Sequence, residues 1–161
     1  MYYEEIFREL SHRRIKYLVA GGVALVLHGV LRLTADLDLL LDMETANLIK
    51  FVEVMQALDY KPKLPVAIND FLDSQTRQKW VLEKNLSAFS FVNTNGYQIV
   101  NVLLNTPLDF SPSAKHKKTF TAKGINIPIV SAADLIQMKR FAGRPQDLAD
   151  IAALEQIINR L

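Results

Sequence analysis

The stretch RLTADLDLLL (residues 32–41), which follows the diglycine Gly21-Gly22, decides the fold of this chain. Apolar residues alternate with Asp36 and Asp38 and then continue alone, which predicts a mostly buried strand over residues 37–41. Residues two apart on a strand face the same side and lie roughly 6.6 Å apart along it. Two carboxylates on one such face repel each other and are costly to remove from water. A divalent cation would relieve both costs, so the pair indicates a metal site.

Length and composition indicate one compact domain over residues 1–161, because no repeat, low-complexity tract or Gly/Ser linker interrupts the chain. Half of the residues are apolar and 22% are charged, which is ordinary for a globular protein. No run of eighteen apolar residues and no signal-peptide pattern is found, so no membrane span is expected. The absence of cysteine excludes disulfides and thiolate metal sites. We therefore expect a cytoplasmic protein.

Hydrophobic periodicity predicts an alternation of helices and strands along the chain. Helices are expected over residues 2–13, 23–30, 44–58, 69–84, 131–141 and 145–159, and strands over 17–20, 37–41, 87–92, 97–104, 119–121 and 125–127. Asn95-Gly96 lies between two β-type runs and is a strong hairpin signal. This order predicts an α+β fold, with a mixed β-sheet packed with helices and a helical C-terminus.

The diglycine, a helix and then Asp-x-Asp on the next strand resemble the nucleotidyltransferase superfamily, which has the DNA polymerase β-like fold. The context Arg32-x-Thr34-x-Asp36-x-Asp38 and the run DLIQMKRFAGRPQDLAD (residues 134–150) are similar to its small bacterial members, which include abortive-infection-type toxins. The resemblance covers about residues 17–154. It implies a nucleotidyltransferase-like sheet that binds a nucleoside triphosphate with Mg²⁺ or Mn²⁺. It also implies transfer of a nucleoside monophosphate to a hydroxyl of an acceptor, which is a small molecule, a protein or RNA.

The resemblance also implies roles for individual residues. Asp36 and Asp38 would hold the metal and, with Asn101, form the catalytic set. Gly21 and Gly22 would present backbone N–H groups to phosphate, where side chains would block the approach. Four polar residues would complete the nucleotide-binding set: Arg32, Thr34, Lys139 and Arg144.

Structural alternatives exist for these residues. The two aspartates could be a capping or turn pair at the start of a strand, and the diglycine could be a tight turn. Thr34 could make ordinary hydrogen bonds within its loop. Arg32 could pair with Asp36 or Asp38, contact phosphate, or lie on the surface.

The chain departs from the family pattern at Asn101. Catalytic members carry a third carboxylate on a later strand, and the matching segment here, residues 99–104, has asparagine at that position. Asparagine can offer a metal one neutral carbonyl oxygen but cannot act as a general base. Asp42 has the same strand parity as the two aspartates but is expected beyond the end of the strand, and Asp109, in the loop after residues 99–104, is a weaker candidate still. A non-catalytic relative is therefore the alternative: a regulator or a toxin–antitoxin component, with a partner protein or a second copy of the chain completing the site.

Two further groups of charged residues bear on function. Asp147 and Asp150 are expected to pair with Lys139, Arg140 or Arg144 and to lock the last two helices together. Lys115, Lys117, Lys118 and Lys123 form a basic cluster, which favours a solvated surface or, as a third hypothesis, a nucleic-acid-binding module.

Overall fold

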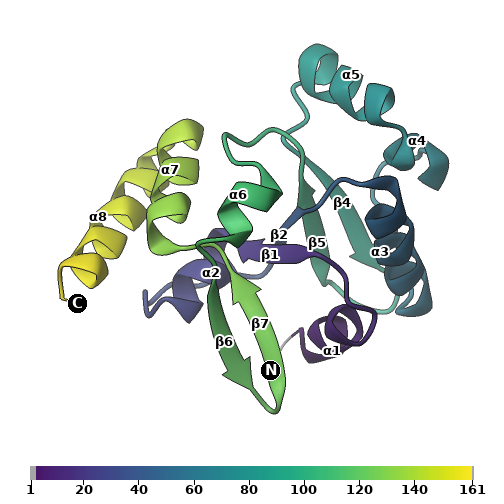
Figure 1. The fold of residues 1–161 in the computed structure, drawn as a ribbon. Coiled ribbons are helices and arrows are strands. Elements are labelled where there is room, and N and C mark those ends of the chain that lie inside the picture. The colour runs from purple at the N-terminus through teal and green to yellow at the C-terminus, as the bar shows by residue number, and fades with distance from the viewer. Residues whose placement is uncertain (1–2, 161) are drawn as a thin grey trace.

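A computed structural model describes residues 3–160, and in this part of the chain seven strands form one mixed sheet (Figure 1). The strands are β1 (Tyr17–Ala20), β2 (Leu37–Leu41), β3 (Tyr60–Pro62), β4 (Ala88–Asn93), β5 (Ile99–Leu103), β6 (Lys118–Ala122) and β7 (Ile125–Ile129). The helices are α1 (Glu4–His12), α2 (Gly21–Leu27), α3 (Thr45–Ala57), α4 (Ile68–Leu72), α5 (Ser74–Lys84), α6 (Phe110–Ala114), α7 (Ala132–Ala142) and α8 (Pro145–Asn159). This architecture confirms the expected α+β fold class.

The centre of the sheet brings together segments that are distant in the sequence. The strand order is β3-β4-β5-β2-β1-β7-β6. β2 runs antiparallel to β1, with Asp38 opposite Ala20, and parallel to β5, with Asp38 opposite Asn101. The diglycine follows Ala20 directly, so these pairings place the diglycine, Asp38 and Asn101 at one point of the sheet.

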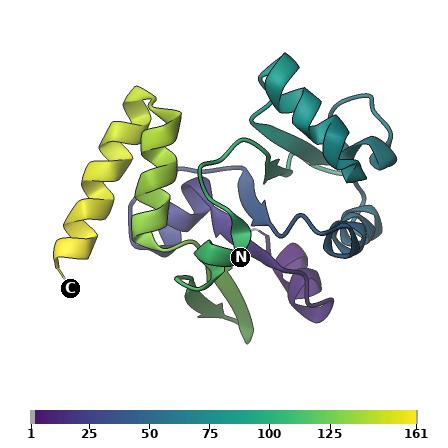
Figure 2. The same cartoon turned by 45° about the horizontal axis from the view of Figure 1, so that its top comes forward.

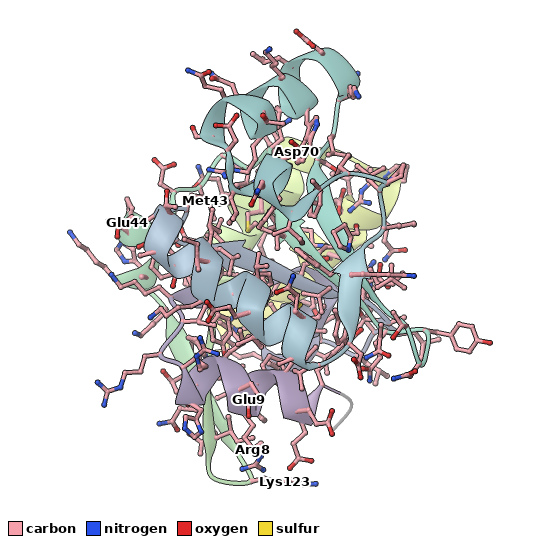
Figure 3. The ribbon with its side chains drawn as sticks, turned by 90° about the vertical axis from the view of Figure 1, so that its right-hand side faces the viewer. Arg8, Glu9, Met43, Glu44, Asp70 and Lys123 are labelled. Atoms are coloured by element: carbon pink, nitrogen blue, oxygen red, sulfur yellow. The ribbon has the colours of Figure 1, made fainter. Side chains whose placement is uncertain are left out.

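The two faces of the sheet differ in character, as β4 shows. Phe89 lies on the apolar face and stacks on Phe71 of α4 and Trp80 of α5, with ring centroids 4.7 and 5.2 Å apart. Ser90, the next residue, lies on the opposite face because side chains alternate along a strand. Figure 3 shows the molecule from the apolar side, with α1, α3, α4 and α5 in front of the sheet. The polar face of the sheet is therefore on the side where α7 and α8 lie (Figure 1).

α7 and α8 form a helical hairpin at one side of the sheet (Figures 1 and 2). Ser131 begins α7 by accepting a hydrogen bond from the backbone N–H of Asp134 at 3.1 Å. Gly143 ends α7 in the left-handed conformation, with φ of +66°. Pro145 then opens α8, where its missing N–H costs nothing. The expected boundaries of both helices are therefore confirmed to within two residues.

Two expectations about local structure were wrong, and two short elements were not predicted. Residues 69–84 form two helices, because the side chain of Asp73 accepts from the Thr76 N–H at 3.0 Å and starts α5 anew. The short elements β3 and α6 carry no periodicity that could have been recognised, and β3 contains a proline tolerated at the sheet edge. The helix expected over 23–30 begins at Gly21 and ends at Leu27. The first expected helix begins at position 2, outside the described residues.

None of the helices within residues 3–160 is long and apolar enough to cross a membrane.

Candidate functional site

Asp36 and Asp38, called the site pair below, share one face at the start of β2. Asp36 immediately precedes the strand and Asp38 is its second residue. The side-chain nitrogen Nδ2 of Asn101 donates to Oδ1 of Asp38 at 2.8 Å and to Oδ2 of Asp36 at 3.4 Å. One amide reaches both carboxylates, so the same-face arrangement expected from the alternation is present.

The amide of Asn101 is held from both ends. Its Oδ1 accepts a hydrogen bond of 2.6 Å from the hydroxyl of Ser90, which lies directly opposite it on β4. The carbonyl oxygen was expected to be the metal-facing atom. In the structure it faces Ser90, and the N–H₂ group faces the site pair, because ionised carboxylates can only accept hydrogen bonds.

The diglycine packs directly against the site pair and its loop. Gly21 has φ of +61°, and a Cβ added there would lie 2.0 Å from Oδ2 of Asp38. A Cβ on Gly22 would lie 2.4 Å from Oγ1 of Thr34. The backbone conformation at Gly21 and both close approaches require glycine. The absence of side chains on the diglycine therefore lets Asp38 and Thr34 pack directly against its backbone in the wall of the cleft.

The charge of Asp38 is only partly compensated. Burial raises the pKa of Asp38 above its ordinary value, and the neighbouring Asp36 carboxylate raises it further. The hydrogen bond from Asn101 and the more distant charges of Lys139 and Arg144 lower the pKa of Asp38 but do not cancel the rise. The site pair therefore has room for additional positive charge.

Asp147 and Asp150, called the helical pair below, lie on α8 and are buried against α7. Nζ of Lys139 lies 3.0 Å from Oδ2 of Asp150 and 3.5 Å from Oδ1 of Asp147, with only 8% of the lysine side chain exposed. Nε of Arg144 lies 2.9 Å from Oδ2 of Asp147. The pairing expected from the sequence is therefore confirmed for Lys139 and Arg144, whereas Arg140 pairs with Glu155 on the surface.

These partners reverse the effect of burial on the helical pair. Burial alone would raise the pKa of Asp147 and of Asp150. The hydrogen bonds and charges of Arg144 and Lys139 outweigh burial and hold both pKa values below the ordinary value of 3.8. Both carboxylates of the helical pair are therefore ionised and saturated with cations.

Arg32 contacts a carboxylate that was not expected. Its guanidinium Nη1 donates to Oδ2 of Asp150 on α8, 118 residues further along the chain, and not to Asp36 or Asp38. This ion pair ties the loop that leads into the site pair to the helical hairpin.

A cleft of about 760 Å³ lies between the sheet, the 32–36 loop and α7. All nine residues that the sequence nominated line it: Gly21, Gly22, Arg32, Thr34, Asp36, Asp38, Asn101, Lys139 and Arg144. Polar side chains of Ser87, Asn105 and Thr106 and apolar side chains of Leu33, Met138 and Phe141 complete much of the remaining wall. The structure thus brings the nominated residues together in one cleft.

The sequence from residue 3 to residue 161 matches the model of a protein family described as nucleotidyltransferase of unknown function (DUF6036). The chain belongs to this family. No curated protein matches it.

Solved structures show the same fold at low sequence identity. The lincosamide antibiotic adenylyltransferase LnuA, solved with lincomycin bound, is 18% identical, with a TM-score of 0.63 over 97% of this chain and 96% of that chain. ANT(2")-Ia in complex with adenylyl-2"-tobramycin is 12% identical, with a TM-score of 0.60 over 96% and 89%. A putative nucleotidyltransferase from Thermotoga maritima is 14% identical, with a TM-score of 0.56 over 98% and 91%.

The oxygen atoms of the site pair fit a hard divalent cation such as Mg²⁺. Asp38 carries charge that its neighbours compensate only in part. Within residues 3–160, however, no three His, Cys, Asp or Glu side chains form a ligand cluster for a metal ion. The residues of this nucleotidyltransferase-family chain therefore fit a cation held by two protein carboxylates.

Sequence analysis did not predict two polar residues that contact residues of the site, Ser90 and Asp150. Ser90 carried a usable signal, because a hairpin centred on Asn95-Gly96 pairs Ser90 with Asn101, and this register is the observed one although the turn spans residues 94–97. The contact of Asp150 with Arg32 had no signal in the sequence, because no local pattern relates residues 118 positions apart.

Proposed function

We propose that this nucleotidyltransferase-family chain binds a nucleoside triphosphate with Mg²⁺ or Mn²⁺ in the cleft and transfers a nucleoside monophosphate to a hydroxyl of an acceptor. The observation that carries the proposal is the contact of the site pair with bare diglycine backbone in the wall of the cleft. A carboxylate pair short of positive charge suits a cation, and backbone N–H groups at the start of α2 suit phosphate oxygens.

The role that each residue has in binding depends on whether its charge is already paired within the protein and on how exposed its side chain is. Asp36 and Asp38 hold the cation, which when bound neutralises phosphate oxygens and the carboxylates together. Gly21 and Gly22 let Asp38 and Thr34 pack closely on the backbone that would contact phosphate. Arg144 also pairs with Asp147, but 69% of its side chain is exposed, so among the cations it is the one best able to reach phosphate directly.

Lys139 and Arg32 are held by the helical pair, so they act mainly through their electrostatic field.

The proposed transfer is a displacement at the α-phosphorus. The oxygen of the acceptor hydroxyl forms a bond to that phosphorus, and the bond from the α-phosphorus to the bridging oxygen of the β-phosphate breaks, releasing pyrophosphate. Asn101 cannot accept the hydroxyl proton, so the proton leaves to solvent. The protein contributes positioning and charge, which are the main sources of rate in phosphoryl transfer.

A small hydroxyl-bearing molecule is the acceptor class that the cleft favours over a protein or RNA. Its volume of about 760 Å³ lies in the range of small-molecule sites, roughly 300–1,000 Å³. Two relatives of the same fold were solved with small molecules, lincomycin in one and adenylyl-2"-tobramycin in the other. The apolar side chains of Leu33, Met138 and Phe141 offer a surface for such a molecule.

Calorimetry with ATP, CTP, GTP and UTP in the presence of Mg²⁺ tests the binding step. Wild type is expected to bind at least one nucleotide, and Asp36→Ala and Asp38→Ala are expected to lose it. Asp109→Ala is the matched control, because Asp109 is exposed and its side chain makes no capping hydrogen bond. Failure of wild type to bind, or equal binding by the two variants, contradicts the proposal.

A second candidate is a non-catalytic nucleotide-binding protein, such as a regulator or a toxin–antitoxin component. The orientation of Asn101 favours it, because a donor N–H₂ group stands beside the site pair where a proton acceptor would serve transfer. Transfer of radiolabel from α-labelled nucleotide to candidate acceptors decides between the two. Labelling by wild type at a rate close to that of Asn101→Asp supports the enzyme, and labelling by Asn101→Asp alone supports the non-catalytic protein.

A further inference from the structure

The Ser90–Asn101 pair has one favoured orientation beside the site pair. The amide faces two carboxylates on one side, at 2.8 and 3.4 Å, and a hydroxyl on the other, at 2.6 Å. Turning the amide over would point its carbonyl oxygen at Asp36 and Asp38, which is repulsive. The hydroxyl of Ser90 donates to the carbonyl oxygen and therefore fixes Asn101 as a hydrogen-bond donor toward the site pair.

The charges that surround the site pair allow one divalent cation. Asp36 and Asp38 together carry two negative charges when ionised, which one such cation neutralises. The other buried carboxylates next to the cleft, Asp147 and Asp150, are committed to Lys139, Arg144 and Arg32. Within the described residues, no third acidic or histidine ligand joins the site pair. Among the described protein groups beside the site pair, a second cation would gain only the neutral amide of Asn101, with its nitrogen foremost.

We propose that the nucleotide-loaded site takes one divalent cation, and that Ser90 and Asn101 occupy the place of a second. The inference rests on the proposed nucleotide binding. In it, the Asn101 N–H₂ group supplies part of the positive charge that a second cation would bring. Ser90 is a positioning residue that keeps this group turned toward Asp36 and Asp38.

Manganese counting by electron paramagnetic resonance tests the stoichiometry. The purified chain is saturated with a non-hydrolysable nucleoside triphosphate analogue and titrated with Mn²⁺, and the signal of free Mn²⁺ gives the number bound. Mn²⁺ held by the analogue alone is measured without protein and subtracted, and the remaining count is compared with one per chain. Wild type is expected to bind one, and Asn101→Asp, which adds a third carboxylate, is expected to bind two.

Asn105→Asp is the matched control for added charge. Asn105 lines the same cleft, but the hydrogen bonds to the site pair come from Asn101 and not from Asn105. This variant is expected to bind one Mn²⁺, as wild type does. Two Mn²⁺ in Asn105→Asp would mean that any added carboxylate suffices and would overturn the role given to Asn101.

Ser90→Ala tests the positioning role without adding charge. Loss of the hydroxyl frees the Asn101 carbonyl to turn toward a bound cation. The count is expected to stay at one while the affinity for Mn²⁺ rises about fivefold, the equivalent of one ordinary hydrogen bond. Ser90→Thr keeps a hydroxyl and is expected to restore the wild-type affinity. Unchanged affinity in Ser90→Ala contradicts the positioning role.

The outcomes separate this inference from the proposed function. Two Mn²⁺ bound by wild type with nucleotide overturns the one-cation inference and leaves nucleotide binding intact. A wild-type chain that binds no nucleotide overturns the proposed function and the inference with it. The wild-type and Ser90→Ala measurements decide the question even where Asn101→Asp does not fold.

Discussion

Two pairs of buried or half-buried aspartates lie at or next to the cleft. They are the site pair, Asp36 and Asp38, and the helical pair, Asp147 and Asp150. The helical pair is surrounded by three cations, and the pKa values of both its members are lowered. Among residues 3–160, the amide of Asn101 alone lies within hydrogen-bonding distance of the site pair, and the pKa of Asp38 is raised. Carboxylates whose charge is fully compensated hold structure together. Carboxylates left short of positive charge are available for a ligand.

The largest expected effect comes from removing the buried cation of the helical pair. Lys139→Met leaves Asp147 and Asp150 buried with fewer partners, and we expect the free energy of unfolding to fall by about 3 kcal/mol. Urea denaturation measures it. Arg140→Met is the control on the same helix, because Arg140 is 65% exposed and pairs with the exposed Glu155. The control is expected to lose less than about 0.5 kcal/mol. Similar losses in the two variants would contradict the structural role of the helical pair.

A change in the backbone beside the site pair is expected to have an intermediate effect. Gly21→Ala meets a left-handed backbone and places Cβ 2.0 Å from Oδ2 of Asp38, so stability should fall by about 2–3 kcal/mol. Gly124→Ala is the control: φ is +74° there, but no atom lies within 4 Å of the added Cβ, and about 1 kcal/mol is expected.

The same pair of variants separates strain from function when nucleotide binding is measured by calorimetry. Gly21→Ala should abolish binding because Asp38 must move, whereas Gly124→Ala should bind as wild type does. Retained binding in Gly21→Ala would show that the site pair tolerates displacement.

The smallest expected effect is a gain in stability. Asp38→Asn removes a charge that burial disfavours, and we expect the free energy of unfolding at pH 7 to rise by about 1 kcal/mol while nucleotide binding is lost. Asp147→Asn, the same chemical change in the helical pair, should reduce stability because it leaves Lys139 and Arg144 with less negative charge. A loss of stability in Asp38→Asn would contradict the comparison.

The pH dependence of that gain follows from the direction of the pKa shift. Because the pKa of Asp38 is raised on folding, its ionised form destabilises the fold, and the cost disappears as the pH falls through the raised pKa toward the ordinary value of 3.8. The advantage of Asp38→Asn over wild type should therefore be present at pH 7 and absent below pH 3.8. Asp147 has the opposite sign: its contribution is present above 3.8 and is lost as the pH falls through its lowered pKa.

The sequence predicted best the elements whose cause is local. β1 and β2 have the expected boundaries, because a short apolar run ends at the diglycine in one and an alternation with Asp36 and Asp38 leads into an apolar run in the other. The ends of α7 and α8 follow from Ser131, Gly143 and Pro145, which act within a few residues. Elements without such a cause were missed, as β3 and α6 show.

The sequence predicted which residues line the cleft but not which residues they contact. All nine nominated residues line one cleft, because the fold brings β1, β2, β5 and the helical hairpin together. The partner of Arg32 and the direction of the Asn101 amide were not predicted. Both depend on other residues of the chain, Asp150 for Arg32 and Ser90 for Asn101. A sequence pattern shows the type of each residue but not which residue on another element it contacts.

The central place of β1 and β2 in the sheet has a consequence for how the chain folds. Val19 pairs with Ile129, and Asp38 pairs with Asn101 across 63 residues, so the middle of the sheet closes long loops. Contacts of such sequence separation slow folding, since chain entropy is lost before they form. A growing chain that has not yet emerged beyond β5 has the aspartates but not the surroundings that position them. Ligand binding by the cleft would thus report complete synthesis and folding rather than local structure.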